Sequence, residues 1–446
     1  MNETDNVDLT RVTSGTVMGE LIRRYWIPAF LKEELPYPGC PPVRITLLGE
    51  QLVGFRDGEG RVGLIDEFCA HRNVSLFFGR AEDCGIRCPY HGWKYDPSGQ
   101  CVETPNEPPE SRLREKVRLT AYPCAERGGM IWTYMGPPDL EPALPEFEWA
   151  MVPDDHRYAT KRHQETNFFQ PIEGNIDNSH VPFLHSDLYG SVPTPGMTPF
   201  WAAPQTAEDD GVMTGILGDK RSDQAQMGPA RIYVEPTDCG IMVASRRKTG
   251  ESESYWRFNQ FILPFYCVIA PIDPSERKIS VQFNVPIDDE NTFAYAVDYC
   301  PDHPFTQEDI EYYRNGGSIQ PIMIPGTFLA KQNKGNGYLL SRELQRAGNL
   351  TGVGTIAMQD GAVQESMGAI TDRSREQLGS ADLGVDTARR TALAAARAVA
   401  NGDADPPGIA PKEHQLRAAS VFLDDDADWN TSRLSLCDTS PGEVRD

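Results

Sequence analysis

Residues 69–94 read CAHRNVSLFFGRAEDCGIRCPYHGWK, and this stretch decides the first domain of the fold. It contains two motifs, Cys69-Ala70-His71 and Cys88-Pro89-Tyr90-His91, in which a cysteine precedes a histidine by two or three residues. A 2Fe-2S centre of the Rieske type needs two thiolates on one iron and two imidazoles on the other. Two loops that each supply one thiolate and one imidazole meet that need. The stretch therefore predicts a 2Fe-2S cluster held by Cys69, His71, Cys88 and His91.

A zinc site is the main alternative for these four ligands. In a Cys2His2 zinc site both cysteines precede both histidines, whereas here the two residue types alternate. Cys84 and Cys88 could also form a pair, but that pair would leave both histidines unexplained. The iron–sulfur interpretation is therefore favoured.

A second group of possible metal ligands follows in Asp177-Asn178-Ser179-His180 and in His185. A mononuclear non-heme iron site of oxygenases uses two histidines and one carboxylate, and it leaves positions open for dioxygen. We expect Asp177 and His180 to share one face of a helix, because they lie three residues apart. Pro182 should end or kink that helix, so that His185 returns to the same metal. An isolated pair of histidines would be unremarkable, but a redox cluster upstream requires an electron acceptor.

The carboxylate ligand must come from a distant segment, and the residues alone leave the choice open. Five carboxylates in the later part of the chain are suitable by type: Asp360, Glu365, Asp372, Asp382 and Asp386. A protein that only carries electrons, with a second domain that binds a partner, would need none of them.

The distribution of strand-like and helix-like segments predicts two domains and an α+β fold. Short strand-like runs between Gly, Pro and Asp predict a small antiparallel β domain over residues 43–145, ending in a proline-rich linker. Longer strands and several helices predict a larger domain over residues 146–405, with an antiparallel, helix-grip-like sheet flanked by helices. We expect residues 1–42 to pack on this larger domain. Residues 406–446 should form a loosely ordered tail, or one that lies over a neighbouring subunit.

Composition and charge exclude several classes of protein. The chain has 446 residues, of which 39% are hydrophobic and 24% charged, as is typical of a globular protein. A formal charge of -23 without a basic cluster disfavours nucleic acid and anionic membrane surfaces as partners. The longest apolar stretch, residues 261–272, is short and contains two prolines, so we expect no membrane span. The N-terminus lacks the features of a signal peptide, and the cysteines are too few for a disulfide scaffold, so we expect a cytoplasmic protein.

With these motifs the chain resembles the oxygenase component, or alpha subunit, of Rieske non-heme iron ring-hydroxylating oxygenases. The resemblance rests on the two cluster motifs and on residues 173–185, EGNIDNSHVPFLH. Within that family the chain looks most like the phthalate dioxygenase branch, which also includes aryl-ether O-demethylases. The family places its carboxylate ligand on a late helix, which matches residues 358–368 and selects Asp360, with Asp372 as the second choice.

The resemblance also implies a multicomponent reaction. A separate NAD(P)H-dependent reductase with flavin and iron–sulfur groups would supply electrons to the cluster of one subunit. Asp177 would pass them to the mononuclear Fe2+ of the neighbouring subunit in a head-to-tail ring, a homotrimer or a dimer of trimers. The enzyme would use O2 to hydroxylate an aromatic, phthalate-like substrate. Oxidative O- or N-demethylation of a methoxylated aromatic is the alternative, and a Rieske electron carrier without oxygenase activity is a further one.

An acidic chain that binds an aromatic acid needs an arginine in its pocket. Arg246 and Arg247 follow a predicted strand, and their alternation points one to each face of the sheet. Arg246 is the candidate for the substrate carboxylate. The alternative is that both arginines are surface charges at a strand end.

Overall fold

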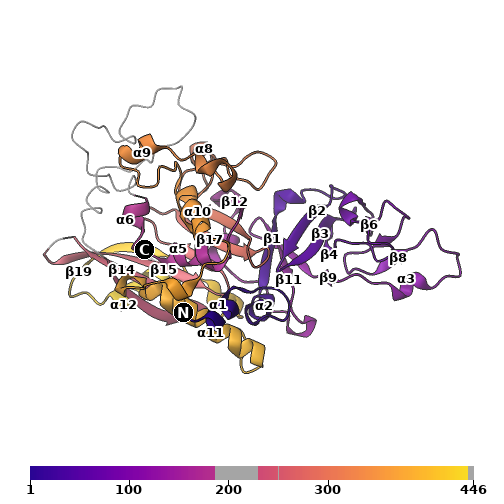
Figure 1. Cartoon of the computed structure of the whole chain (residues 1–446), viewed down its shortest axis with the longest axis horizontal. Coiled ribbons are helices and arrows are strands. Elements are labelled where there is room, and N and C mark those ends of the chain that lie inside the picture. Colours follow the sequence, from indigo (N-terminus) through magenta and orange to yellow (C-terminus); the bar gives the residue numbers. More distant parts are fainter. Residues whose placement is uncertain (186–229, 250, 440–446) are drawn as a thin grey trace.

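The computed structural model describes residues 1–185, 230–249 and 251–439. Two β-rich bodies lie end to end along the long axis of the molecule (Figure 1). The predicted α+β class is confirmed, with a small antiparallel body followed by a larger sheet flanked by helices. Among the described residues, no helix is both long and apolar enough to cross a membrane.

The smaller body contains two four-stranded antiparallel sheets and α3 (Leu113–Lys116). The first sheet has the order β2 (Val43–Leu47), β3 (Glu50–Arg56), β4 (Val62–Asp66) and β9 (Ala121–Tyr122). The second has the order β5 (Arg80–Glu82), β6 (Gly85–Arg87), β7 (Lys94–Tyr95) and β8 (Cys101–Glu103). The strand-like run of residues 117–121 in the sequence predicts a further strand. Most of this run instead makes isolated backbone hydrogen bonds to residues 99–101.

The N-terminal segment contacts both bodies. α1 (Glu3–Thr10) and α2 (Val17–Arg23) pack against α11 (Leu383–Asn401) of the larger body. In contrast, β1 (Trp26–Leu31) pairs with β11 (Met130–Tyr134), which also pairs with β10 (Cys124–Arg127). This three-stranded sheet lies between the two bodies in Figure 1. The domain limits at residues 42, 145 and 405 stay predictions.

The larger body is built on one antiparallel sheet. Its strand order is β12 (Arg157–Gln164), β18 (Thr292–Tyr299), β17 (Ile279–Pro286), β16 (Tyr266–Ile269), β15 (Glu253–Ile262), β14 (Gly240–Lys248) and β13 (Arg231–Thr237). The sequence predicts strands over residues 230–234, 241–247, 255–263, 278–285 and 292–297, and these are β13, β14, β15, β17 and β18. It does not predict β12 and β16. The helices that join or cover the sheet are α4 (Glu148–Met151), α5 (Phe169–Ile176), α6 (Val181–Leu184), α8 (Gln307–Arg314), α9 (Arg342–Arg346), α10 (Ile356–Ser366) and α12 (Trp429–Cys437). Helix α5 packs against β15, β16 and β17. Helix α11 packs against β13 and β14.

The C-terminal segment corrects the expectation of a loosely ordered tail. β19 (Ala419–Asp424) pairs with residues 253–258 of β15, along the edge that β16 leaves free. Its apolar side chains join a cluster around Trp256 and Trp429. The apolar residues of β19 alternate as in other strands. Its last residue, however, begins the acidic run of residues 424–426, and aspartate is uncommon in strands.

Candidate metal centres

The four predicted cluster ligands lie on two loops, residues 69–74 and 88–93, which share one pattern of backbone hydrogen bonds. In each loop the cysteine amide donates to the carbonyl five residues later, and the cysteine carbonyl accepts from the amide four residues later. The residue four positions after each cysteine has a left-handed backbone, with φ of 54° at Asn73 and 77° at Gly92. Asn and Gly adopt this conformation at low cost. The loops therefore present their ligands as a pseudo-symmetric pair.

The side chains of these loops fit a 2Fe-2S cluster. The imidazole rings of His71 and His91 have centroids 4.5 Å apart. Cys69 and Cys88 are buried, and both burial and the charge of Cys69 raise the pKa of the Cys88 thiol. The Nδ1 atom of His91 is buried without a hydrogen-bond partner among the described residues. Two adjacent thiols beside two adjacent imidazoles, one with an unpartnered nitrogen, match the ligands of a Rieske centre.

Two residues that sequence analysis missed support this site. The hydroxyl of Tyr95 lies 3.2 Å from Sγ of Cys69. The indole of Trp93 stacks on His71, with ring centroids 4.5 Å apart and planes 5° from parallel. Hydrogen bonds to cluster sulfurs tune the reduction potential, and a packed ring fixes the orientation of a ligand. In the sequence, the position of Trp93 and Tyr95 just after His91 was the signal that could have indicated their role.

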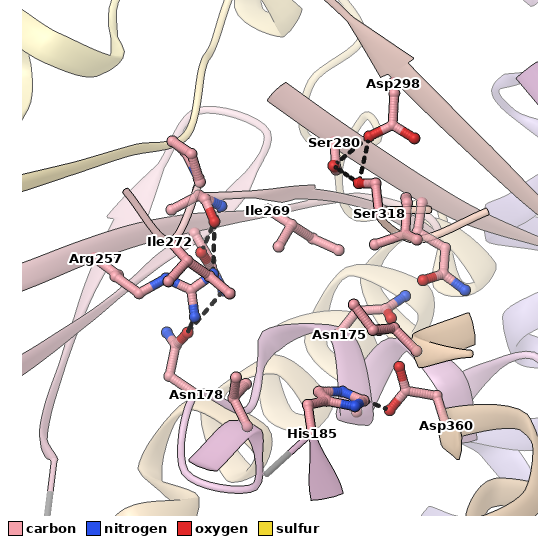
Figure 2. A pocket seen from close by; sticks show the side chains of 18 of the residues that line it. Asn175, Asn178, His185, Arg257, Ile269, Ile272, Ser280, Asp298, Ser318 and Asp360 are labelled. Carbon is pink, nitrogen blue, oxygen red and sulfur yellow. Dashed lines mark hydrogen bonds and ion pairs between the residues drawn. The ribbon is translucent and has the colours of Figure 1, made fainter. Parts of the chain in front are cut away.

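Among the described residues, His180, His185 and Asp360 form the one set of three whose ligand atoms all lie within 4.8 Å. Oδ1 of Asp360 lies 3.6 Å from Nε2 of His180 and 3.5 Å from Nε2 of His185. His185 and Asp360 point toward each other at one end of a pocket (Figure 2). Two histidines and one carboxylate are the ligands of non-heme Fe(II) oxygenases.

The backbone around these ligands differs from the predicted helix. α5 ends immediately before Asp177, which is its C-cap with an extended backbone, and α6 begins after His180. Pro182 therefore lies in the first turn of a helix instead of ending one. Its missing amide hydrogen is not needed there. Asp177 and His180 lie in the break between α5 and α6 and not on one helix. Helix α6 then brings His185 back toward His180.

Each histidine of this site is oriented by a second partner. Nδ1 of His180 faces Oδ2 of Asp177 at 3.5 Å. Nδ1 of His185 lies 2.6 Å from Oε1 of Gln359, whose amide nitrogen donates to a backbone carbonyl at 3.0 Å. Both contacts leave the Nε2 atoms facing Asp360, and such partners fix the tautomer of a metal-binding imidazole. Gln359 was missed in the sequence, where its position beside Asp360 was the only signal.

Both carboxylates of the site favour the ionised form. Burial raises the pKa of Asp360, but His185, His180 and Arg162 outweigh burial and hold the pKa below its ordinary value. Burial also raises the pKa of Asp177, and the neighbouring His180 and Ser179 again bring it below the ordinary value. A carboxylate must be deprotonated to bind a metal. Both carboxylates are therefore held in the form that a metal requires.

The structure does not bring the other carboxylates of the sequence analysis to this site. Asp372, the second choice for the ligand, accepts hydrogen bonds from the backbone and hydroxyl of Ser374. The remaining ones are engaged elsewhere: Glu365 with Tyr338, Asp382 with the amide of Gly379, and Asp386 with Arg390. The helix α10 places Asp360 alone beside the two histidines.

Arg246 also lies away from the site. Its Nε donates to Ser254 at 2.9 Å and its Nη2 pairs with Asp425 at 2.5 Å. The predicted alternation of Arg246 and Arg247 is present: the buried Arg247 donates to the backbone carbonyl of Asn178 at 2.6 Å. Arg246 instead faces the side of the sheet that carries Trp256, because neighbouring strand residues face opposite sides.

A pocket of about 150 Å³ adjoins the two histidines and Asp360. An apolar cavity of about this volume holds one benzene ring. Apolar side chains of residues 269–272 form one wall, and residues 174–185 around α5 and α6 form much of the rest, with a few polar residues from β15 and β17 (Figure 2). The pocket can therefore place one substituted ring beside a metal at this site.

Arg257 is the pocket arginine that sequence analysis missed. Only 3% of its surface is exposed. Its Nη1 donates to Oδ1 of Asn178 at 3.1 Å, and its Nη2 donates to the carbonyl of Ala270 at 2.5 Å. Within the described part of the chain, its Nε has no hydrogen-bond partner and the guanidinium forms no ion pair. This arginine is thus a buried cation in the pocket wall, and none of the described carboxylates forms an ion pair with it.

Comparison with known proteins agrees with these two centres. Residues 25–123 match the family "Rieske [2Fe-2S] domain", and residues 133–439 match the family "LigXa C-terminal domain like". The 3-chlorobenzoate-3,4-dioxygenase oxygenase subunit of Comamonas testosteroni is 34% identical, over 96% of this chain and 96% of that protein. The phthalate 4,5-dioxygenase oxygenase subunit of Pseudomonas putida is 36% identical, over 95% and 93%. The crystal structure of dicamba monooxygenase bound to 3,6-dichlorosalicylic acid has a TM-score of 0.55 at 17% identity, over 86% and 98%, and shows the same fold.

A Rieske domain joined to a domain with a two-histidine, one-carboxylate site defines the class as iron-dependent oxygenases. The chain belongs to the Rieske non-heme iron oxygenase family, as an oxygenase alpha subunit. The family and the 2Fe-2S cofactor predicted from sequence are thereby confirmed, and His180, His185 and Asp360 form the candidate site for a mononuclear iron.

Proposed function

We propose that this chain is the terminal oxygenase of a multicomponent system that hydroxylates an aromatic carboxylate. The observation that carries this proposal is the buried guanidinium of Arg257, which has no ion-pair partner among the described residues and lies in the pocket beside the candidate iron ligands. An uncompensated buried cation is costly. A substrate carboxylate would offset that cost by accepting a charge-assisted hydrogen bond from the guanidinium, whose Nη1 and Nη2 each donate to one described acceptor and have a second hydrogen. In a chain with a charge of -23, such a local cation is what an anionic substrate requires.

The shape of the pocket and the relatives support an aromatic ring. The volume suits one ring, and Ile269 and Ile272 give it an apolar wall (Figure 2). The two relatives described above are named for chlorobenzoate and phthalate, which are both aromatic carboxylates. We infer that Arg257 orients the ring by its carboxylate while the isoleucines exclude water from its face.

We assign the metal ligands as the sequence predicted. Cys69, Cys88 and their partner histidines would hold the cluster, and His180, His185 and Asp360 would hold Fe2+. When bound, the cluster supplies single electrons and the iron supplies oxygen activation. Asp177 and Gln359 keep the imidazoles in the orientation that directs Nε2 to the metal.

The positions of the two sites support an assembly of head-to-tail copies. The cluster loops lie in the body at one end of Figure 1, and α6 and α10 lie in the other body. His71 and His91 are partly exposed, and so is the side chain of Asp177 at 18%. We infer that the cluster of one subunit meets Asp177 of the next in a ring, a homotrimer or a dimer of trimers. A separate NAD(P)H-dependent reductase would reduce the cluster, and a cytoplasmic location stays a prediction.

Oxygen uptake with a panel of aromatic acids tests this function. With a generic reductase, we expect uptake that depends on an aromatic acid and not on its uncharged amide. Arg257→Gln should lose most of this activity, because the carboxylate loses the buried guanidinium that binds it. Arg246→Gln is the matched control, since Arg246 lies outside the pocket, and it should retain activity. No uptake with any aromatic acid would refute the proposal.

Product and metal analyses separate the alternatives. A hydroxylated ring supports hydroxylation, whereas release of formaldehyde from a methoxylated acid would show demethylation.

An oxygenase binds one iron more than its cluster contains, and an electron carrier does not. His180→Ala should therefore lose the extra iron and keep the cluster. An unchanged iron content in that variant would remove the oxygenase assignment of this site.

A further inference from the structure

The pocket has a second polar end, away from Arg257. Ser280 of β17 and Ser318, which follows α8, lie side by side there with their Oγ atoms 3.2 Å apart. Asp298 of β18 lies behind them. Figure 2 shows this group and Arg257 on opposite sides of Ile269, with Asp360 at a third corner.

Asp298 engages the protons of both serines. The hydroxyls of Ser280 and Ser318 donate to its Oδ1 at 2.6 Å and 2.7 Å, and Gln320 donates to its Oδ2 at 2.7 Å. Burial raises the pKa of Asp298, while these three donors and nearby Lys278 oppose the rise. A hydroxyl has one proton to donate and two lone pairs that accept. Asp298 and the neighbouring serine together engage the two hydroxyl protons, so the serine oxygens are available to a ligand as acceptors.

The backbone holds this arrangement in place. Ser318 has φ of 55°, which is uncommon for a residue other than glycine, and its amide donates to the hydroxyl of Tyr312 at 3.0 Å. Asp298 is 1% exposed, whereas both serines are only partly buried. All three residues line the pocket, but the two serines are more accessible to a ligand there than Asp298 is.

We propose that Ser280 and Ser318 form an acceptor subsite for an O–H or N–H group of the substrate, with Asp298 as the positioning residue. This inference rests on the proposed function, in which Arg257 binds the carboxylate of the same ring. It narrows the substrate class to a hydroxy- or amino-substituted aromatic carboxylate.

Binding of benzoate and of 2-, 3- and 4-hydroxybenzoate to the holoenzyme, measured by calorimetry, tests the subsite. At least one hydroxybenzoate should bind about threefold to tenfold more tightly than benzoate, the gain of one hydrogen bond. Ser280→Ala combined with Ser318→Ala should remove this preference and leave benzoate affinity unchanged. Ser98→Ala is the matched control: that serine also donates to an aspartate, Asp96, at 2.7 Å, but in the other body. Ser318→Gly, which suits the left-handed backbone, is the second variant if the double variant does not fold.

The outcomes distinguish the subsite from the proposed function. If benzoate and all hydroxybenzoates bind equally, or if a preference persists in both serine variants, the subsite is overturned while carboxylate binding by Arg257 stands. If no acid binds, or if Arg257→Gln leaves benzoate affinity unchanged, the proposed function fails and the subsite fails with it. A preference that only the serine variants abolish supports both.

Discussion

At the residue scale, one hydrogen bond to sulfur should set part of the reduction potential of the cluster. The hydroxyl of Tyr95 lies 3.2 Å from Sγ of Cys69. A donor stabilises the reduced cluster, which carries more negative charge, so Tyr95→Phe should lower the potential. One hydrogen bond corresponds to roughly 20–65 mV for a one-electron couple. A redox titration followed by electron paramagnetic resonance measures this shift.

Tyr90→Phe is the control for that measurement. Tyr90 is 54% exposed and its ring lies against His91, but no hydrogen bond joins its hydroxyl to a cysteine in the described residues. The potential should stay at the wild-type value in this variant. Equal shifts in both variants would contradict a specific role for the Tyr95 hydroxyl.

Gln359 should control the affinity of the mononuclear site. Its Oε1 lies 2.6 Å from Nδ1 of His185 and fixes the imidazole, and loss of such a partner lowers metal affinity about tenfold to hundredfold. Gln359→Leu should therefore lose iron at chelator concentrations that wild type withstands, with its cluster absorbance intact. Gln364→Leu, another buried amide on α10 that bonds to Gln164, should keep the wild-type affinity. Iron retained by Gln359→Leu would show that the contact is dispensable.

These residues also show what sequence could and could not predict. The Cys and His motifs were predictable because cluster ligands come in pairs that are close along the chain. Asp360 needed the family resemblance, since a ligand from a distant helix has no local spacing. Arg257 and Gln359 carry no pattern at all: whether a strand arginine faces a pocket depends on the register and on what packs on each face. The alternation of Arg246 and Arg247 was predictable, but the face that holds the substrate was not.

At the scale of elements, α5 is held by one buried charge network. Glu173 accepts from the Nε atoms of Arg373 and Arg389 at 2.8 Å and 2.7 Å, and both arginines are almost fully buried. Removing one charge of a buried network costs about 3–5 kcal/mol, because the others lose their compensation. Glu173→Gln should lower the free energy of unfolding by about that amount. Denaturant unfolding measures it.

Asp386→Asn gives the matched control on α11. Asp386 pairs with Arg390 at the surface, with side chains 46% and 65% exposed, and such pairs contribute about 0–1 kcal/mol. A similar loss in both variants would mean that the network around Glu173 does not anchor α5.

The elements that escaped prediction did so for physical reasons. β5 to β8 have two or three residues each, too few to show an alternating pattern. The short helix α6 was hidden because proline was taken as a helix end, although it also suits a first turn. The long strands β13, β14, β15, β17 and β18 were predictable from their apolar and β-branched residues, whereas β12 reads RYATKRHQ and lacks such a run.

At the scale of the whole molecule, the proposed electron route between subunits depends on the separation of the two sites. The cluster loops and the iron ligands lie in different bodies of one chain (Figure 1). A ring of copies would place the cluster of one subunit against Asp177 of the next. Neither site is then sufficient within its own chain, and activity becomes a property of the junction between subunits.

Mixed rings test this directly. Cys69→Ser subunits lack the cluster and His180→Ala subunits lack the iron, so each alone should be inactive. If both are produced together with different affinity tags and purified in tandem, every mixed three-membered ring contains one junction that joins an intact cluster to an intact iron site. Such rings should show about one third of wild-type activity. Adding Asp177→Asn to the iron-bearing subunit should abolish this activity, and adding it to the other subunit should not. Transfer within a chain predicts no activity in any mixed ring, since no chain carries both centres.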